Sequence, residues 1–293
     1  MKKTGIQWMV AAALGLGLTA RAEPVPFDPE EVGESVAVMC ADALGMLGKE
    51  KIHSQFDMLR QLKDFGVSYQ PDLVVPLDLA SRLDEEGKRR FAGMKLFDAI
   101  YAATFMKRKE LADCLDTIEA VETALDLRSH ADLSGSFFKT FKKAAAEPES
   151  IDIQVLLDQL ANDYVHEVPA MLSSEATANY LIEGLYGFTL QMSSVLEYFS
   201  RPAHNELLRN RIRKHTDTNW LYAMLDIFDS FNRSKKDVRE VAEAEERLAV
   251  IRKMVSAIEA DRAGELTPEE GDRLWADISI KINTIRASFL TPR

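Results

Sequence analysis

Apolar residues recur with a period near 3.6 along almost the whole chain, and no segment shows sustained alternation of apolar and polar residues. The C-terminal part is the most regular. Its two apolar stripes are Val241, Ala244, Leu248, Ile251, Val255 and Ile258, then Leu274, Ile278, Ile282, Ile285 and Phe289. Amphipathic helices have this period, whereas half-buried strands have a period of 2. The sequence therefore predicts an all-α multi-helix bundle, with an antiparallel helical hairpin over about residues 233–293.

A helix start separates the two apolar stripes. After Gly264, the run Thr267-Pro268-Glu269-Glu270 combines a capping hydroxyl, a proline in the first turn and a glutamate at the third helical position. These residues also close a run that imitates a calcium-binding loop, residues 259–270. Ala263 stands in that run where the ion would need an oxygen ligand. The sequence favours a capped helix start over a metal loop.

The N-terminus has the features of an export signal. Lys2 and Lys3 precede a short uncharged apolar run from Met9 to Leu18, and small residues flank Arg21 in Ala20-Arg21-Ala22. This order predicts a signal peptide over residues 1–22. A retained membrane anchor is the alternative, although about 20 apolar residues are needed to cross a bilayer. We expect a periplasmic or secreted protein with no membrane span after cleavage.

The remaining chain is acidic. Loss of Lys2, Lys3 and Arg21 leaves 33 basic and 47 acidic side chains, a balance of −14. Nucleic acid binding depends on clustered Lys and Arg, so we expect no nucleic acid partner. A chain of about 270 residues suits one large domain, and we predict a single all-α domain over residues 23–293.

Two cysteines remain in that domain, Cys40 and Cys114. No cysteine follows the apolar run directly, so the lipobox of a lipoprotein is missing. An oxidising compartment would permit a disulfide between the two cysteines. Both lie among apolar residues at helical spacing, so two separately buried thiols are the alternative. Their spacing matches no metal-binding pattern, and the sequence predicts no cofactor and no metal site.

Two segments repeat one pattern 85 residues apart, residues 98–104 and 183–189. The order is acid, small, aliphatic, Tyr, small, any residue, Thr. The second copy contains Gly184 and Gly187, which together cost a helix about 2 kcal/mol relative to alanine. This cost is tolerable where a second backbone comes close. The repeat therefore predicts a central, pseudo-symmetric pair of closely packed helices.

In each copy the acid and the tyrosine share one helix face, and these four residues are our candidate ligand-binding residues: Asp98, Tyr101, Glu183 and Tyr186. If the helices meet, two carboxylates in a low-dielectric site would raise at least one pKa, as in acid–base pairs. A metal site is a second possibility, although di-iron bundles place His, not Tyr, at this spacing. A structural role is the third, with each carboxylate bound by a tyrosine hydroxyl, a helix N-terminus or an arginine. No catalytic residue is assigned.

One dense basic run stands out on the acidic chain: Arg209, Arg211, Arg213 and Lys214. It could dock an anionic partner. The alternative is that these side chains form salt bridges with the surplus carboxylates.

Several of these segments resemble a family of exported all-α proteins, many of them lipoproteins, from Bacteroidota-type bacteria. The resemblance rests on Ile182–Tyr186, on the small-residue helix at Asp98–Ala103 and on the extended run Phe65–Pro71. It spans roughly residues 60–290. The chain departs from the family in lacking a lipobox cysteine and in having Leu181 where the family is expected to have Trp or another large residue near the Glu-Gly pair. The resemblance implies an exported all-α fold and no particular activity.

Taken together, these features predict an exported helical protein that binds an envelope protein or a small ligand without catalysing a reaction. A carboxylate-based metal-binding or hydrolytic site centred on Asp98 and Glu183 is one alternative. A structural envelope protein is the other, with the C-terminal hairpin as its dimerisation element.

Overall fold

The computed structural model describes residues 59–127, 146, 175–201, 204, 206–216, 218, 221–222, 224–226, 228–229 and 238–291. Of these residues 83% are helical and none lies in a strand, so the predicted all-α class is confirmed. In the same ranges, no helix combines the length and the apolar character that a bilayer crossing requires. The predicted signal peptide, Cys40, and the side chains of Arg213 and Lys214 lie outside the described part.

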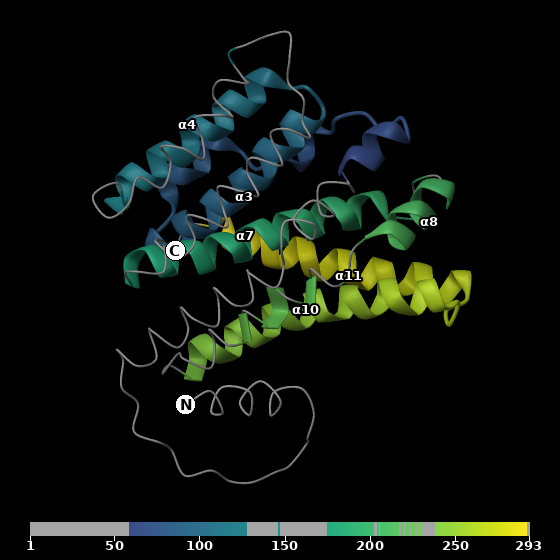
Figure 1. The fold of residues 1–293 in the computed structure, drawn as a ribbon. Helices are drawn as coiled ribbons and strands as arrows, with labels where there is room; N and C mark the ends of the chain where they lie inside the picture. Colours follow the sequence, from purple (N-terminus) through teal and green to yellow (C-terminus); the bar gives the residue numbers. More distant parts are fainter. Residues whose placement is uncertain are drawn as a thin grey trace, which may run out of the picture.

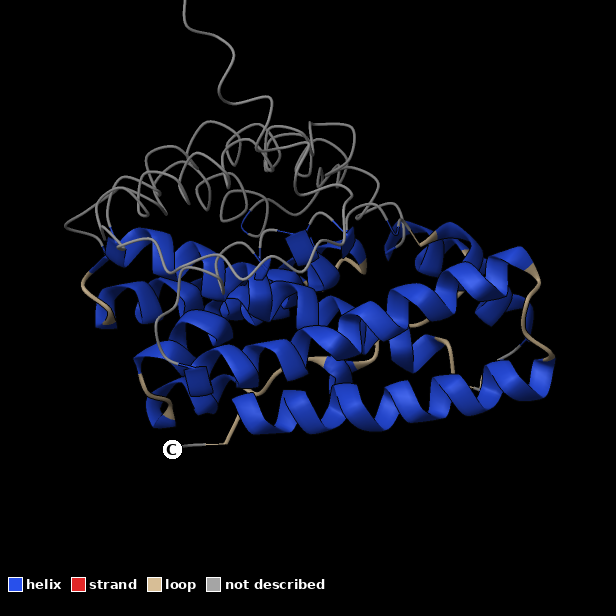
Figure 2. Cartoon of the chain, turned by 90° about the horizontal axis from the view of Figure 1, so that it is seen from below, coloured by secondary structure: helices blue, strands red, loops and turns tan. Residues whose placement is uncertain are grey.

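The helices stack in layers. They are α3 (Glu85–Thr104), α4 (Arg108–Ala124), α7 (Glu175–Phe199), α8 (Glu206–His215), α10 (Val238–Ala263) and α11 (Pro268–Phe289), and two short 3-10 helices, η1 (Pro71–Leu73) and η2 (Leu77–Arg82), precede α3. α4 packs on α3, α3 on α7, α7 on α11 and α11 on α10 (Figure 1). α10 and α11 are joined at one end by a short connection (Figure 2). α3 and α7 therefore lie at the centre of the described fold.

The ends of α10 and α11 follow the local chemistry of the sequence. Gly264 has φ +70°, a left-handed conformation that costs glycine nothing and ends α10. Thr267 then caps α11: its hydroxyl accepts from the amide of Glu270, and the Glu270 carboxylate accepts from the Thr267 amide at 2.9 Å. The predicted capped helix start is confirmed.

Helix α3 is buried on nearly all sides. From Phe91 to Thr104 every residue except Leu96 is buried. The buried stretch includes two charged residues, Lys95 and Asp98, at 0% and 1% exposure. A helix this enclosed needs partners for its polar groups, because an unpaired buried charge costs several kcal/mol.

Glycines bring the backbones of α3 and α7 into contact. A Cβ atom added to Gly93 would lie 1.7 Å from the carbonyl oxygen of Gly184, and one added to Gly187 would lie 1.9 Å from that of Arg90. Real Cβ contacts are almost never below 3.0 Å. The expectation that a second backbone comes close at the α7 glycines is confirmed, and Gly93 supplies the matching gap on α3.

The register of α3 on α7 differs from the spacing of the sequence repeat. Arg90 binds Glu183, and Asp98 binds Gln191, both at a separation of 93 residues. Two equal separations are expected of helices that run in the same direction. The two motif copies are 85 residues apart, so they are displaced by eight residues, or about 12 Å along a helix. The two acids therefore do not lie opposite each other.

Candidate functional site

A segment without α-helix, residues 67–76, lies against α3 before the chain enters η2; we call it the strap. Val75 is its only buried side chain, at 1% exposure. Pro71, Asp72 and Pro76 are exposed. Four further apolar side chains of the strap are partly buried and pack against the core: Val67, Tyr69, Leu73 and Val74. The strap is therefore held by apolar contacts as well as through its backbone.

Side chains of α3 bind that backbone directly. The amide of Gln70 donates to the hydroxyl of Tyr101 at 3.0 Å, and the amide of Val75 donates to the carboxylate of Asp98 at 2.9 Å. The ammonium group of Lys95 donates to the carbonyl of Val75. Side chains of α3 thus bind both the amide and the carbonyl of Val75. The strap runs antiparallel to α3, because its later residue binds the earlier residues of the helix.

Two further helices bind the strap two residues before Val75. The carbonyl of Leu73 accepts from Gln191 Nε2 of α7 at 2.7 Å and from the guanidinium of Arg286 of α11 at 2.8 Å. Gln191 also donates to Asp98 at 2.8 Å, and its side-chain oxygen accepts from Arg286 at 3.0 Å. We call the five side chains that meet here the cradle: Lys95, Asp98, Tyr101, Gln191 and Arg286.

The cradle contains charges in a buried setting. Lys95 Nζ lies 3.1 Å from Asp98 Oδ2. Burial raises the pKa of the Asp98 carboxyl, and this is opposed by Lys95, the Val75 amide and Gln191. Burial also lowers the pKa of Arg286, against the attraction of Asp98. Because charges at such sites depend on their partners, loss of one partner is far more costly than loss of a surface ion pair.

An aromatic cluster holds the other end of the strap. The ring of Tyr69 stacks on that of Tyr101 with 4.9 Å between centroids, and Phe105 packs edge-on against Tyr101 at 5.0 Å. Lys107 Nζ lies 5.6 Å from the Tyr69 ring centre. Burial raises the pKa of Tyr101 to about 12, so its hydroxyl stays protonated over the ordinary pH range. Tyr101 is therefore a hydrogen-bonding and packing group in this state.

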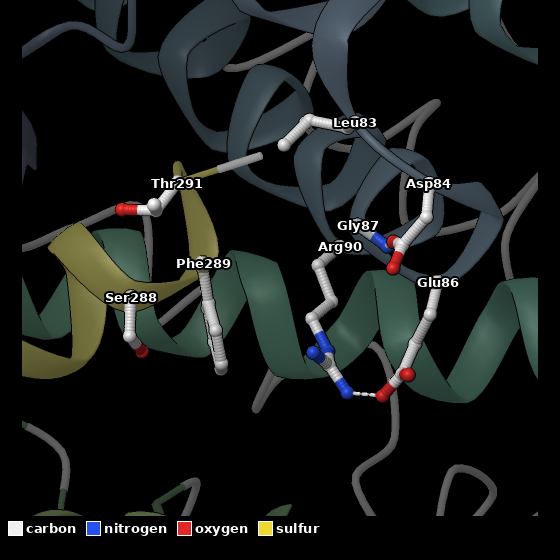
Figure 3. Close-up of a pocket in the computed structure, with 8 residues that line it drawn as sticks. All are labelled: Leu83, Asp84, Glu86, Gly87, Arg90, Ser288, Phe289 and Thr291. Carbon is white, nitrogen blue, oxygen red and sulfur yellow. Dashed lines mark hydrogen bonds and ion pairs between the residues drawn. The ribbon is translucent and has the colours of Figure 1, made fainter. Parts of the chain in front are cut away.

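Glu183 lies in different surroundings. Its carboxylate accepts from Arg90 Nε at 2.7 Å, and Arg90 also pairs with Glu86. The guanidinium of Arg90 lies 4.7 Å from the ring centre of Phe289. Figure 3 shows Arg90 and Phe289 among the residues that line a pocket between the first turns of α3 and the end of α11.

Tyr186 packs next to this pocket. Its ring makes edge-on contacts with Phe228 and Phe289, with centroids 5.2 and 5.3 Å apart. The four candidate ligand-binding residues therefore divide into two pairs. Asp98 and Tyr101 lie under the strap, and Glu183 and Tyr186 lie toward Arg90 and Phe289. Each carboxylate is bound by its own cation, Asp98 by Lys95 and Glu183 by Arg90. Within the described residues, no three His, Cys, Asp or Glu side chains gather so as to hold a metal ion.

Two arginines of the basic run contact other parts of the fold. Arg209 forms a salt bridge with Asp272 of α11 at 2.7 Å, and its side chain is largely buried. The guanidinium of Arg211 lies 4.7 Å from the ring centre of Phe65. Arg209 therefore behaves as the salt-bridging alternative predicts, while Arg211 remains exposed at the surface.

Sequence reasoning missed three members of the cradle: Lys95, Gln191 and Arg286. A signal was present for one of them, because Lys95 is the single polar side chain in the otherwise apolar run of residues 91–97. Such a residue predicts a buried partner across the helix interface.

Cys114 is a free thiol, and burial raises its pKa to about 12.

Comparison of the chain with protein-family models, curated proteins and solved structures finds no significant match. The resemblance to the exported all-α family stays a prediction.

Proposed function

We propose that this chain is an exported helical protein that binds a partner through non-covalent contacts and does not catalyse a reaction. One observation supports this most directly: polar side chains of three helices converge on the backbone of one short segment, residues 67–76, which contains η1. That segment is the strap of the chain itself. A fold that holds a peptide in this way has the chemistry of a binding protein.

The hydrolytic or metal-binding alternative needs Asp98 and Glu183 to act together. They are displaced by about 12 Å along the α3–α7 interface. Asp98 is bound by Lys95, and Glu183 by Arg90. Such pairing removes the free carboxylate oxygens that a metal ion or an attacking water would need.

Metal analysis of the purified protein separates these two functions. We would compare the unchanged chain with Asp98→Asn and Glu183→Gln, and with Glu86→Gln as a control at the pocket rim. The binding function predicts no stoichiometric metal in any of them. Stoichiometric metal that is lost in both Asp98→Asn and Glu183→Gln, and kept in the control, would contradict it.

The partner is expected to be an envelope protein or a small ligand, since we predict a periplasmic or secreted location. A photo-crosslinking residue placed at Leu77, next to the strap and 42% exposed, would report a protein partner in the native compartment. Ile280 on α11, 68% exposed, is the control position. The structural envelope alternative instead predicts self-crosslinks through α10 and α11. An absence of adducts from both positions would count against a protein partner.

A further inference from the structure

The strap is held in one conformation along most of its length. Pro71 opens η1 and Pro76 precedes η2, and the proline ring fixes the backbone angle φ at each place. Within η1 the amide of Val74 donates to the carbonyl of Pro71 at 3.0 Å. The cradle then binds four backbone groups of the strap: the amides of Gln70 and Val75 and the carbonyls of Leu73 and Val75. The strap is therefore a rigid surface segment.

The buried charges of the cradle fix the conformation of the strap. Lys95 and Asp98 are 0% and 1% exposed. Replacing a buried ion pair by well-packed apolar residues is often neutral or stabilising, so the stability of the whole fold does not explain why these two charges lie there. They bind the amide and the carbonyl of Val75, which apolar side chains could not do. Lys95 and Asp98 therefore act as positioning residues for the strap.

The segment that the cradle positions has an exposed outer side that is both apolar and acidic. Leu77, the first residue of η2, is 42% exposed. Asp72, Pro76 and Asp78 are exposed as well. We call these four residues the acidic epitope. Over the longer stretch of residues 71–86 there are five acidic side chains and one basic side chain: Asp72, Asp78, Asp84, Glu85 and Glu86, and Arg82.

The charge of this stretch decides which kind of partner fits it. One basic minus five acidic side chains gives a net charge of −4 over residues 71–86. Such a surface repels nucleic acid and anionic lipid, which bind clustered Lys and Arg, and attracts a protein surface that carries Lys or Arg. Asp78 pairs with Arg82 at 2.7 Å, but these side chains are 65% and 59% exposed, so the pair is weak and leaves Asp78 accessible to a partner.

We propose that the acidic epitope is the docking surface of the chain, preorganised by the cradle, and that its occupant is another protein, which contacts Leu77 with an apolar surface bordered by Lys or Arg side chains. A segment that is fixed before binding loses little conformational freedom when a partner docks, and this raises the affinity. The strap stays in place throughout. This inference rests on the proposed binding function and names its surface and the class of partner.

Hydrogen exchange of the full chain tests whether the cradle positions the strap. The Val75 amide is expected to be protected, because it is bound to Asp98. The Lys95→Met/Asp98→Leu double variant removes both bonds to Val75, so it should speed exchange of that amide at least about tenfold and leave the interior amides of α7 unchanged. Tyr101→Phe, which removes a single hydroxyl, should speed exchange of the Gln70 amide at least about threefold. An unprotected Val75 amide in the unchanged chain, or equal exchange in both variants, would overturn the proposal.

Photo-crosslinking of the full chain in its native compartment tests the docking surface. The probe is a benzophenone amino acid at Ser81, an exposed position of η2 three residues after Asp78. We expect an adduct with another protein whose crosslinked peptide contains Lys or Arg. Leu77→Asp and Asp72→Lys should each lower the adduct yield at least about tenfold, and the Lys95→Met/Asp98→Leu double variant should lower it too. Ile280→Asp, at a residue of α11 that is 68% exposed, is the matched control and should leave the yield unchanged.

Several outcomes of the crosslinking would overturn the proposal. A full adduct yield from the Leu77→Asp chain would place the partner elsewhere, and a crosslinked peptide without Lys or Arg would contradict the expected charge. An adduct between two copies of the chain would make a second copy the occupant. Adducts from a probe at Ile280, with none from Ser81 or Leu77, would refute the acidic epitope and leave the proposed function standing. An absence of adducts from all three positions would count against both.

Discussion

From the contact between α3 and α7 we expect opposite changes in stability when Gly93 of α3 and Gly184 of α7 are replaced by alanine. Gly93→Ala would place a Cβ atom 1.7 Å from the carbonyl oxygen of Gly184. Both groups belong to helix backbones, so neither can rotate away. Gly184→Ala would place its Cβ atom 3.8 Å from the nearest atom, the carbonyl oxygen of Arg89. One change therefore forces the helices apart, and the other adds only an ordinary van der Waals contact.

The size of each effect follows from these distances. To bring the Gly93→Ala contact to 3.0 Å, the helices must separate by 3.0 − 1.7 = 1.3 Å. Overpacking costs about 1–3 kcal/mol in ordinary cores, and a clash between two backbones belongs at the upper end. The better helix propensity of alanine returns about 1 kcal/mol. We expect Gly93→Ala to lower the free energy of unfolding by about 2 kcal/mol or more, and Gly184→Ala to raise it by up to about 1 kcal/mol.

Thermal melting followed by circular dichroism measures both. In a chain of this size 1 kcal/mol corresponds to about 2–4 °C, so Gly93→Ala should lower the Tm by about 4–8 °C, whereas Gly184→Ala should raise it slightly. The matched pair controls for the shared loss of a glycine. If Gly93→Ala melts at or above the Tm of the unchanged chain, or if both variants lose stability equally, the reasoning about the α3–α7 contact is wrong.

Three further outcomes are expected. Asp98→Asn leaves Lys95 without its countercharge and should destabilise the chain by about 3–5 kcal/mol in urea unfolding, with much of the loss recovered in a Lys95→Met/Asp98→Leu double variant. Hydrogen bonds from Thr267 lower the pKa of Glu270 below its ordinary 4.5, so its stabilising effect is complete above about pH 5 and disappears as the pH falls through the lowered value. The Tm difference between the unchanged chain and Glu270→Gln should therefore shrink on acidification. The thiol of Cys114, with a pKa raised to about 12, should react with a disulfide reagent at about pH 8 only after unfolding.

Local chemistry explains what the sequence could predict. The helical period, the Thr267–Glu270 cap and the glycine at position 187 can each be read within a few residues. The structure shows the helices, the cap and a second backbone close to Gly187. The single domain, the hairpin and the export signal remain predictions. The register between α3 and α7 could not be read in the same way, because it depends on contacts between residues 93 apart.

The sequence repeat misdirected the candidate site for that reason. It suggested that Asp98 and Glu183 occupy equivalent places, whereas one lies beneath the strap and the other beside Arg90. What the chain does repeat is a carboxylate bound by a cation of α3, Lys95 in one case and Arg90 in the other. The relative positions of α3 and α7 are needed to distinguish two separate ion pairs from one shared pair of acids.

The polar contacts between α3 and α7 also explain why one register is chosen. The glycines favour this register, because a Cβ atom at position 187 would lie 1.9 Å from the carbonyl oxygen of Arg90. Sliding α7 by one turn, about 5.4 Å, would separate Asp98 from Gln191 and Arg90 from Glu183 at the same time. Each loss would leave a buried group unpaired. The glycines therefore set how close the helices come, and the glycines and the two polar pairs together oppose sliding. The same Gln191 that fixes the register also binds the strap, so the cradle can form only when the helices are in that register.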